Sequence, residues 1–311
     1  MKSVKIENLT KVYGSVHALD GLTLEVSPGS VFGFLGPNGA GKTTTLRILA
    51  GLAQATAGKI IISGEQSIMT DAERQACIGY LPEEPAFYAW MSPREYLDYV
   101  GRIFKLGQPE RRQRIEQLLE QSGLTEVSKR HIGGFSRGMR QRLGIAQALI
   151  NKPSVLLLDE PVSALDPAGR KEVLEMIEAL GHSCTVIMSS HILADVERIC
   201  DTVGIINKGK LITQDNKEAL LERYAIPALE LTTGNGSASL MPEWKTRLEN
   251  LPGVTGVSVE GYAFHIAVKD VFTAQSQIMQ DALQHKLHFE KLEVVKPSLE
   301  DIFMQLTGSQ K

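Results

Sequence analysis

The chain has 311 residues, about twice the length of a typical domain, so one large domain or two modest ones are expected. It is 43% hydrophobic and carries a net charge of −3, which disfavours a dedicated nucleic-acid binder because such binding depends on a basic surface. No apolar stretch reaches the roughly 18–20 residues of a membrane-spanning helix, and the start of the chain lacks the apolar run of a signal peptide. We therefore expect a soluble cytoplasmic protein whose three cysteines are reduced.

A strand–helix–strand pattern runs through the first two thirds of the chain. An apolar strand at residues 31–35 precedes a glycine-rich loop and a helix over residues 43–52. Two further apolar strands are expected at 155–158 and 185–188, separated by a helix over 171–180 whose apolar side chains share one face. This order of elements predicts an α/β domain with a parallel sheet.

The other residues predict a helical insertion and a second, smaller domain. Residues 92–150 have the apolar spacing of helices and lie between strands of the predicted sheet. The character of the chain changes near residue 217, and the elements then follow in the order βαββαβ, which is typical of a small α+β ferredoxin-like domain. These elements are expected at 228–232, 242–251, 254–259, 262–268, 272–287 and 289–295, with a loop at 234–237 and a terminal helix over 298–306.

The glycine-rich loop carries the clearest chemistry, because it fits the pattern GxxxxGK[ST] between a strand and a helix. Glycines let backbone N–H groups turn toward phosphate oxygens at the positive end of the helix. Lys42 can then reach the β- and γ-phosphates of a nucleotide, and the Thr43 hydroxyl can bind Mg²⁺. The less favoured alternative is that these residues form only a flexible loop between the strand and the helix, without binding phosphate. The predicted nucleotide-binding residues of the loop are Gly36, Pro37, Asn38, Gly39, Ala40, Gly41, Lys42, Thr43 and Thr44.

Three side chains at strand ends complete the predicted catalytic site. The strand at 155–158 ends in Asp159, which suits a metal ion, and Glu160, which suits a general base for water. If no phosphate loop preceded them, these two acidic residues would be better interpreted as solvated side chains at the end of a strand. His191 follows the strand expected at 185–188. It therefore lies at the carboxyl end of a strand, where open α/β sheets bind their ligands, and could bind the γ-phosphate. A lone histidine is more often structural, and the other six histidines keep that interpretation.

Residues 3–217 resemble the nucleotide-binding subunit of an ATP-binding cassette (ABC) transporter. The run Phe-Ser-Arg-Gly-Met-Arg-Gln-Arg at 135–142 is similar to the LSGGQ signature of that family, and Ser-Ala-Leu-Asp at 163–166 is similar to its D-loop. Tyr13 matches the aromatic residue that stacks on adenine, and Leu-Pro-Glu at 81–83 matches the Q-loop. All of these motifs occur once and in the order of the family.

The resemblance implies an ATPase mechanism with ATP and Mg²⁺ as cofactors. Two copies of the chain would close head to tail, so that Ser136 and Gly138 of one copy touch the γ-phosphate held by the other. Glu160, His191 and Lys42 would be catalytic, and Thr43, Glu83 and Asp159 would hold the metal. The helical insertion, about residues 85–150, would contact a separate integral-membrane permease. No nucleic-acid partner is expected.

Some positions depart from the family pattern. Phe135, Arg137 and Met139 replace the usual residues of the signature, and Glu83 replaces the usual glutamine of the Q-loop. These variants, with the run Pro-Ser-Leu-Glu-Asp-Ile-Phe at 297–303, resemble the ATPase subunits of bacterial type-two exporters. We therefore expect a nucleotide-binding domain over 1–217 and an accessory domain over 218–311. The function expected is an ATPase on the inner face of the cell membrane that energises export.

Two alternatives remain open. An importer subunit with a regulatory C-terminal domain would be favoured by a small-barrel pattern after residue 217. A soluble ABC protein that acts on ribosomes or DNA would be favoured by a second cassette or by long coiled coils, and the sequence contains neither.

Overall fold

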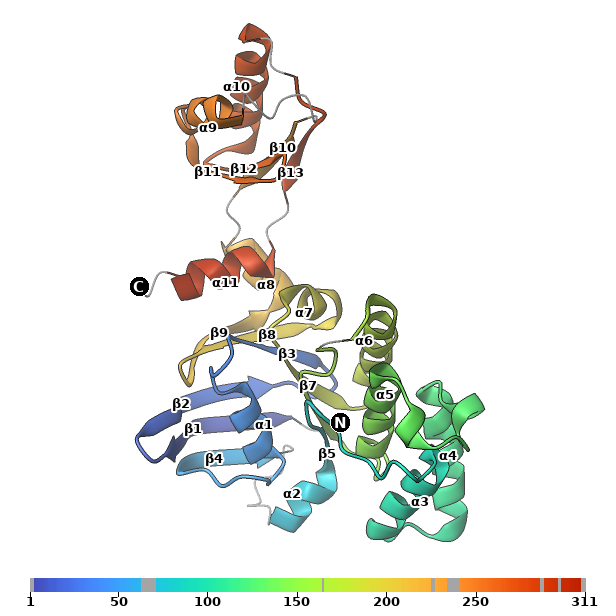
Figure 1. The fold of residues 1–311 in the computed structure, drawn as a ribbon. Helices are drawn as coiled ribbons and strands as arrows, with labels where there is room; N and C mark the ends of the chain where they lie inside the picture. Colours follow the sequence, from blue (N-terminus) through green and yellow to red (C-terminus); the bar gives the residue numbers. More distant parts are fainter. Residues whose placement is uncertain are drawn as a thin grey trace. The chain divides into compact units, whose positions relative to one another are not determined.

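The chain divides into two compact units, Met1–Lys217 and Glu218–Lys311 (Figure 1). In this computed structural model the residues described are 3–62, 71–163, 165–224, 227–233, 241–285, 288–295 and 298–308. The loop predicted at 234–237 and Ala164 of the D-loop-like segment lie outside the described residues. Of the helices in the described part of the chain, none is both long and apolar enough to span a bilayer.

A six-stranded sheet forms the centre of the first unit. Its strands, in spatial order, are β5 (Ile78–Leu81), β6 (Val155–Asp159), β7 (Thr185–Ser190), β3 (Val31–Leu35), β8 (Thr202–Asn207) and β9 (Lys210–Asn216). The first five are parallel, and β9 is antiparallel to β8. Every residue of β3, β6 and β7 is buried, which explains their continuous apolar runs. The predicted parallel sheet is confirmed.

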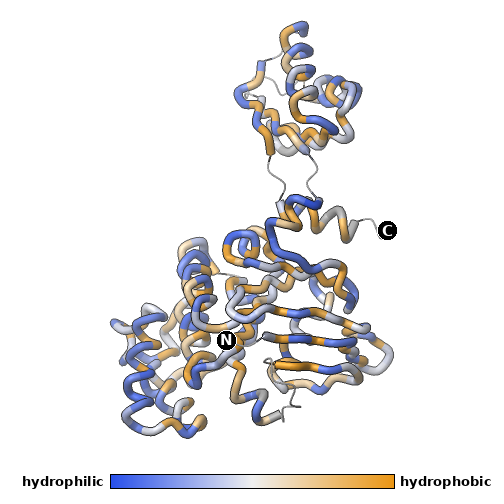
Figure 2. The backbone as a smooth tube through the Cα atoms, turned by 180° about the vertical axis from the view of Figure 1, so that it is seen from behind, coloured by the Kyte–Doolittle hydropathy of each residue, from blue (hydrophilic) through white to orange (hydrophobic). Residues whose placement is uncertain are grey.

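A second sheet of three antiparallel strands was not apparent from the sequence. It is made of β2 (Val16–Val26), β1 (Val4–Tyr13) and β4 (Ala57–Ile62) in that spatial order. Val4, Ile6 and Leu9 of β1 are buried and are separated by hydrophilic residues, as expected when one face of a strand is buried (Figure 2). Its inward side chains share one core with β3, β6 and the helix α1. The sheet therefore supports the phosphate loop from the side.

The helix after the phosphate loop, α1 (Lys42–Leu49), is shorter than predicted. The prediction extended it to residue 52, but the chain turns at Gly51, whose φ of 74° is in the left-handed region. A buried face made of Leu46, Ile48 and Leu49 packs into the shared core. The position of α1 is thus set by packing on both sides.

Helices form the insertion and cover the central sheet. α2 (Asp71–Cys77) precedes β5, and the insertion contains α3 (Pro93–Ile103), α4 (Gln108–Gln121) and α5 (Arg137–Ala148), with short 3-10 turns at Thr125–Val127 and Ile132–Gly134. These three long helices contact one another and lie together beside the sheet (Figure 1). A capping box of Ser92 and Glu95 begins α3. Two later helices, α6 (Pro167–Gly181) and α7 (Leu193–Ile199), pack on β7 and on each other.

The second unit has the predicted ferredoxin-like topology. Its strands β10 (Ala228–Thr232), β11 (Val254–Glu260), β12 (Ala263–Val268) and β13 (Lys291–Val295) lie in the spatial order β11-β12-β10-β13 and are antiparallel throughout. The helices of this unit are α8 (Lys217–Tyr224), α9 (Met241–Glu249), α10 (Val271–Gln284) and α11 (Leu299–Gly308). Trp244 of α9 and Ile278 of α10 pack on Phe264 and other core residues of the sheet. The predicted fold class is confirmed in both units.

Candidate active site

The phosphate loop joins β3 to α1, and two of its glycines, Gly36 and Gly41, leave no room for a side chain. Gly41 has φ 111°, and a Cβ there would lie 2.7 Å from the Ala18 carbonyl oxygen. A Cβ at Gly36 would lie 2.4 Å from the Ile206 carbonyl oxygen. The first N–H groups of α1 have no partner within the helix, because a helix leaves its first turn unpaired. The loop is therefore a tight backbone cradle at a helix N-terminus, the geometry that binds phosphate.

Lys42 places a cation inside this cradle. Its side chain is only 6% exposed, and Nζ donates a hydrogen bond to the Gly36 carbonyl oxygen over 2.6 Å. The same nitrogen lies 3.5 Å from Oε1 of Glu160. A lysine held by a carbonyl and a carboxylate can exchange these partners for phosphate oxygens, since all are acceptors.

Asp159 ends β6 and is buried among hydroxyl groups. Its Oδ1 accepts hydrogen bonds from Thr43 Oγ1 at 3.1 Å and from Ser189 Oγ at 2.7 Å. Burial raises the pKa of the Asp159 carboxyl, and these two hydrogen bonds partly offset the rise. Burial and the charge of Asp159 also raise the pKa of the neighbouring Tyr80 to about 12. The result is a group of hard oxygen donors beside the phosphate loop.

Glu160 has an unusual backbone conformation. Its φ is 47°, in the left-handed region that residues other than glycine seldom adopt. The Glu160 N–H donates to Ser189 Oγ over 3.0 Å, which helps to hold this conformation. Such outliers concentrate at functional sites, where surrounding contacts hold them in place. The side chain is 9% exposed, and its Oε2 lies 2.8 Å from Nδ1 of His191.

The structure brings most of the predicted residues into one cleft of about 200 Å³. The cleft is lined by Ala18, Pro37, Asn38, Gly39, Ala40, Gly41, Lys42, Thr43, Thr44, Glu83, Glu160 and His191. Asp159 lies behind it in contact with Thr43, and Gly36 contributes through its bond to Lys42. Glu83 reaches the cleft from the segment after β5. Lysine, carboxylate and imidazole groups therefore converge on a phosphate cradle.

Three residues that were predicted to bind ATP lie outside this cleft. Among the described lining residues of the cleft, Tyr13, Ser136 and Gly138 do not occur. Tyr13 ends β1 with 51% of its surface exposed, and Lys11 Nζ lies 4.5 Å from the centre of its ring. Ser136 caps α5, where its Oγ accepts a hydrogen bond from the Met139 N–H over 3.2 Å. The predicted roles of these three residues in binding ATP therefore stay predictions.

Comparison with known proteins identifies the family. The ABC transporter family matches residues 19–163, and the C-terminal domain of DrrA1-3-like ATP-binding proteins matches residues 220–307. The chain is 36% identical to the uncharacterized ABC transporter ATP-binding protein YxlF of Bacillus subtilis, over 97% of this chain and 99% of that one. It is also 36% identical to the bacitracin transport ATP-binding protein BcrA of Bacillus licheniformis, over 98% of this chain and 97% of that one. The chain belongs to the ABC transporter ATP-binding proteins.

Solved structures agree with this assignment. A dimeric ATP-binding cassette in a post-hydrolysis state, bound to ADP and Pi, superimposes with a TM-score of 0.60 at 25% identity, over 69% of this chain and 98% of that one. The fold of the ABC cassette is therefore confirmed. ABC cassettes of this kind bind adenine nucleotides, and this ABC protein is an ATPase.

Sequence reasoning missed Ser189 in the active site of this ABC protein. Its hydroxyl contacts both Asp159 and the backbone of Glu160. The available signal was a pair of serines at the end of a strand that is otherwise apolar. The contacts of Ser189 arise because β7 lies beside β6 in the sheet, with Asp159 opposite Ser189.

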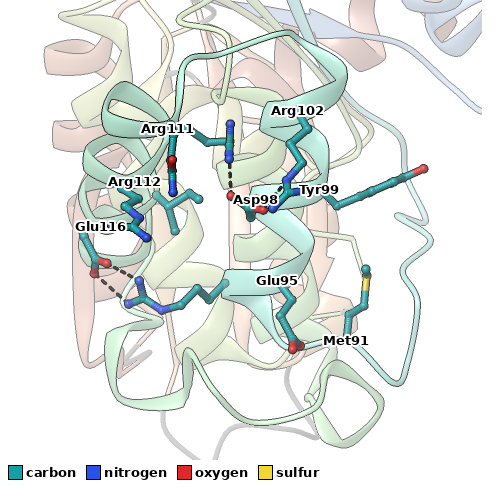
Figure 3. A pocket seen from close by; sticks show the side chains of 11 residues that line it. Met91, Glu95, Asp98, Tyr99, Arg102, Arg111, Arg112 and Glu116 are labelled. Atoms are coloured by element: carbon teal, nitrogen blue, oxygen red, sulfur yellow. Dashed lines mark hydrogen bonds and ion pairs between the residues drawn. The ribbon is translucent and has the colours of Figure 1, made fainter.

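A larger cavity of about 740 Å³ lies in the helical insertion, away from the phosphate loop (Figure 3). Several of its charged side chains form ion pairs: Asp98 accepts from Arg111 Nε at 2.5 Å and from Arg102 Nε at 2.7 Å. Arg94 and Glu116 form another pair, with Nη2 and Oε2 2.9 Å apart. The cavity is lined by Met91, Arg94, Glu95, Asp98, Tyr99, Arg102, Gln108, Arg111, Arg112, Ile115 and Glu116. It belongs to the surface of the insertion and not to the ATP site.

Proposed function

We propose that this ABC protein is the ATP-hydrolysing subunit of an exporter and works on a separate permease at the cytoplasmic face of the cell membrane. The proposal of ATP hydrolysis rests on one observation: four side chains meet at the phosphate loop, those of Lys42, Asp159, Glu160 and His191. The export part is supported by the similarity over almost the whole chain to a bacitracin transport protein. The ferredoxin-like second unit, in place of a small barrel, also favours the exporter over an importer subunit.

The hydrolytic step would use Glu160 as general base. The loop N–H groups and Lys42 would hold the phosphates, with the γ-phosphate facing Glu160. Glu160 would take a proton from water while the water oxygen attacks the γ-phosphorus and ADP leaves. His191, 2.8 Å from Oε2, would orient the carboxylate and bind the γ-phosphate. Ser189 would keep Glu160 in its unusual backbone conformation.

The oxygen donors of the cleft fit Mg²⁺. Thr43 and Asp159 lie in contact, and Glu83 lines the same cleft. In the described part of the chain no three His, Cys, Asp or Glu side chains cluster as a metal-binding set. Mg²⁺ does not need such a set, because it is usually bound by one or two carboxylates, phosphates and water. Bound there, Mg²⁺ would neutralise negative charge on the phosphates.

A second copy would supply the rest of the ATP site. Ser136 and Gly138 begin α5, so they present a helix N-terminus suited to phosphate, although they do not line the cleft among its described residues. The dimeric state of the similar cassette bound to ADP and Pi supports this arrangement. The exposed ring of Tyr13 would stack on adenine.

The helical insertion would be the surface for the permease. Three aromatic side chains there are unusually exposed: Tyr88 at 49%, Trp90 at 67% and Tyr99 at 42%. They lie side by side, with the ring of Tyr88 centred 5.9 Å from that of Trp90 and 6.0 Å from that of Tyr99. Clustered exposed aromatic residues mark interaction surfaces, where they supply much of the contact area.

The direct test is reconstitution of the full chain with its candidate permease in proteoliposomes. We expect Mg²⁺-dependent ATP hydrolysis and ATP-driven movement of substrate, both abolished by Lys42→Ala. Trp90→Ala should weaken co-purification with the permease and leave ATP binding to the isolated chain unchanged. Absence of ATP hydrolysis in both the chain and the complex would refute the ATPase, and hydrolysis without transport would refute the exporter.

A further inference from the structure

An ion pair with a buried carboxylate joins the first turns of α6 and α7. Arg170 Nε donates to Asp195 Oδ1 over 2.6 Å. The Asp195 side chain is 3% exposed, whereas Arg170 is 33% exposed. The second carboxylate oxygen, Oδ2, is buried and has no hydrogen-bond partner among the described residues. Within the part of the chain that the structure describes, this carboxylate therefore depends on Arg170 alone.

Each of the two helices begins shortly after a segment that the sequence singled out, the D-loop-like residues 163–166 for α6 and His191 for α7. α6 begins at Pro167, after the segment 163–166, and the Arg170 N–H donates to the Asp166 carbonyl oxygen over 2.9 Å. α7 begins at Leu193, two residues after His191. The ion pair therefore lies one helical turn behind both segments.

These connections form a closed ring through the catalytic residues. From Glu160 the chain leads through residues 161–166 to Arg170, and from Asp195 it leads back to His191. The ring closes where His191 Nδ1 lies 2.8 Å from Glu160 Oε2. A change at the ion pair can thus reach the His191–Glu160 contact through residues 192–194 on the α7 side and through residues 161–169 on the α6 side.

The ion pair ties the first turn of α7 to the first turn of α6. The helix α7 has only seven residues, and no side chain caps its N-terminus. On the side that faces the sheet, Val196 packs closely against Gly33 of β3. The approach is so close that a Cβ added at Gly33 would lie only 2.2 Å from Val196 Cγ1. The position of α7 relative to α6 is held at the first turn by Asp195. Arg170 itself stands in the first turn of α6, where the helix dipole disfavours a cation, so the pairing compensates an unfavourable location.

We propose that Arg170 and Asp195 are a positioning pair that keeps His191 directed at Glu160 and thereby supports ATP hydrolysis without contacting the nucleotide. The proposal rests on the catalytic roles proposed above for Glu160 and His191. Without the pair, the first turn of α7 can shift relative to α6, and a displacement of about 1 Å at a catalytic group can slow a reaction up to roughly a hundredfold.

The same two helices provide a matched control. Arg198 Nη2 lies 3.4 Å from Glu175 Oε1, further along both helices, and these side chains are 44% and 52% exposed. In the full chain we expect Asp195→Asn and Arg170→Gln each to lower kcat for ATP about tenfold, with KM for ATP within about twofold. The double variant should be no slower than the slower single variant, because the pair acts as one unit. Arg198→Gln should keep kcat within about twofold of the natural chain.

The decisive measurement repeats Asp195→Asn in a His191→Ala background. If the pair acts through His191, the substitution should then have no further effect on kcat. An equal fractional loss in both backgrounds, or a raised KM with unchanged kcat, would overturn the positioning role. A fully active His191→Ala variant would overturn both the catalytic role of His191 and the positioning role. If thermal melting shows that Asp195→Asn or Arg170→Gln is unfolded, Arg170→Lys and Asp195→Glu are measured instead. Both conservative variants should then keep at least half of the kcat of the natural chain. A lower kcat in both would contradict the proposal.

Discussion

The two groups of residues proposed to surround ATP are placed very differently by the same cassette. The phosphate-loop group comes from β3, β6 and β7, which are neighbours in the central sheet, so their carboxyl ends meet at one edge. Its side chains are already in hydrogen-bond contact. The signature group, Ser136 and Gly138, stands at the start of α5 in the helical insertion. A single chain thus brings the proposed acid–base groups together, whereas in the proposed function the signature would be supplied by a second copy.

The largest effect is expected in the phosphate-loop group, from Glu160→Gln. The amide keeps the size of the side chain but cannot accept the proton of water, and a positioned general base contributes about 10²–10⁴ in rate. ATP should still bind, and a dimer should accumulate with ATP and Mg²⁺, as measured by turnover and by size-exclusion chromatography. Near-normal turnover would remove Glu160 from the role of base.

The signature group should instead control association. Ser136→Ala in the Glu160→Gln background should weaken the ATP-dependent dimer roughly tenfold or more, since a hydrogen bond to a charged phosphate contributes about 1.5–3 kcal/mol. Analytical ultracentrifugation with and without ATP measures this effect.

Loss of a helix cap must be separated from loss of that contact, because Ser136 also caps α5. Ser92→Ala provides the control, since Ser92 caps α3 in the same insertion. Both variants should lose about 1 kcal/mol of helix stability, but only Ser136→Ala should weaken the dimer. Equal weakening by both variants would show that the signature serine acts only as a cap.

Adenine stacking by Tyr13 should have an intermediate effect on affinity. An aromatic face under a base contributes about 1–3 kcal/mol in single-strand nucleic-acid sites, and we apply that magnitude here. Tyr13→Ala should therefore weaken ATP binding about tenfold or more, measured by calorimetric titration, whereas Tyr13→Phe should be tolerated. Equal affinities of the Ala and Phe variants would show that the ring does not stack.

Glu83, which comes from the segment after β5, should have a smaller effect. It lines the ATP cleft and also a second hollow beside Arg137 and Arg140 of the signature helix. Glu83→Ala should raise the Mg²⁺ concentration for half-maximal activity by roughly tenfold or less and lower turnover. Glu83→Gln should retain most activity, because an oxygen remains. An alanine variant with unchanged Mg²⁺ dependence would show that this side chain is not part of the site.

How far the sequence predicts this site depends on the distance along the chain between contacting residues. Lys42 and Thr43 follow from local spacing, because strand, loop and helix are consecutive. Asp159 and Glu160 follow from their place at the end of an apolar strand. The contacts of Ser189 and the Arg170–Asp195 pair join residues 25 to 30 positions apart and leave no local pattern. The pairing of β4 with β1 also went unpredicted, since these strands are more than 40 residues apart in the chain, whereas the local hairpin of β1 and β2 was simply missed.

The smallest effect should come from removing the second unit altogether. Both groups of ATP-site residues lie within Met1–Lys217, which is compact by itself, and the core of the second unit contains only its own residues. A fragment of residues 1–217 should therefore fold and bind ATP within about twofold of the full chain, a change of less than about 0.5 kcal/mol. Calorimetric titration and thermal melting measure this. Failure to fold would mean that residues after 217 complete the core of the first unit, whereas a folded fragment that binds ATP much more weakly would assign the second unit a direct part in the ATP site.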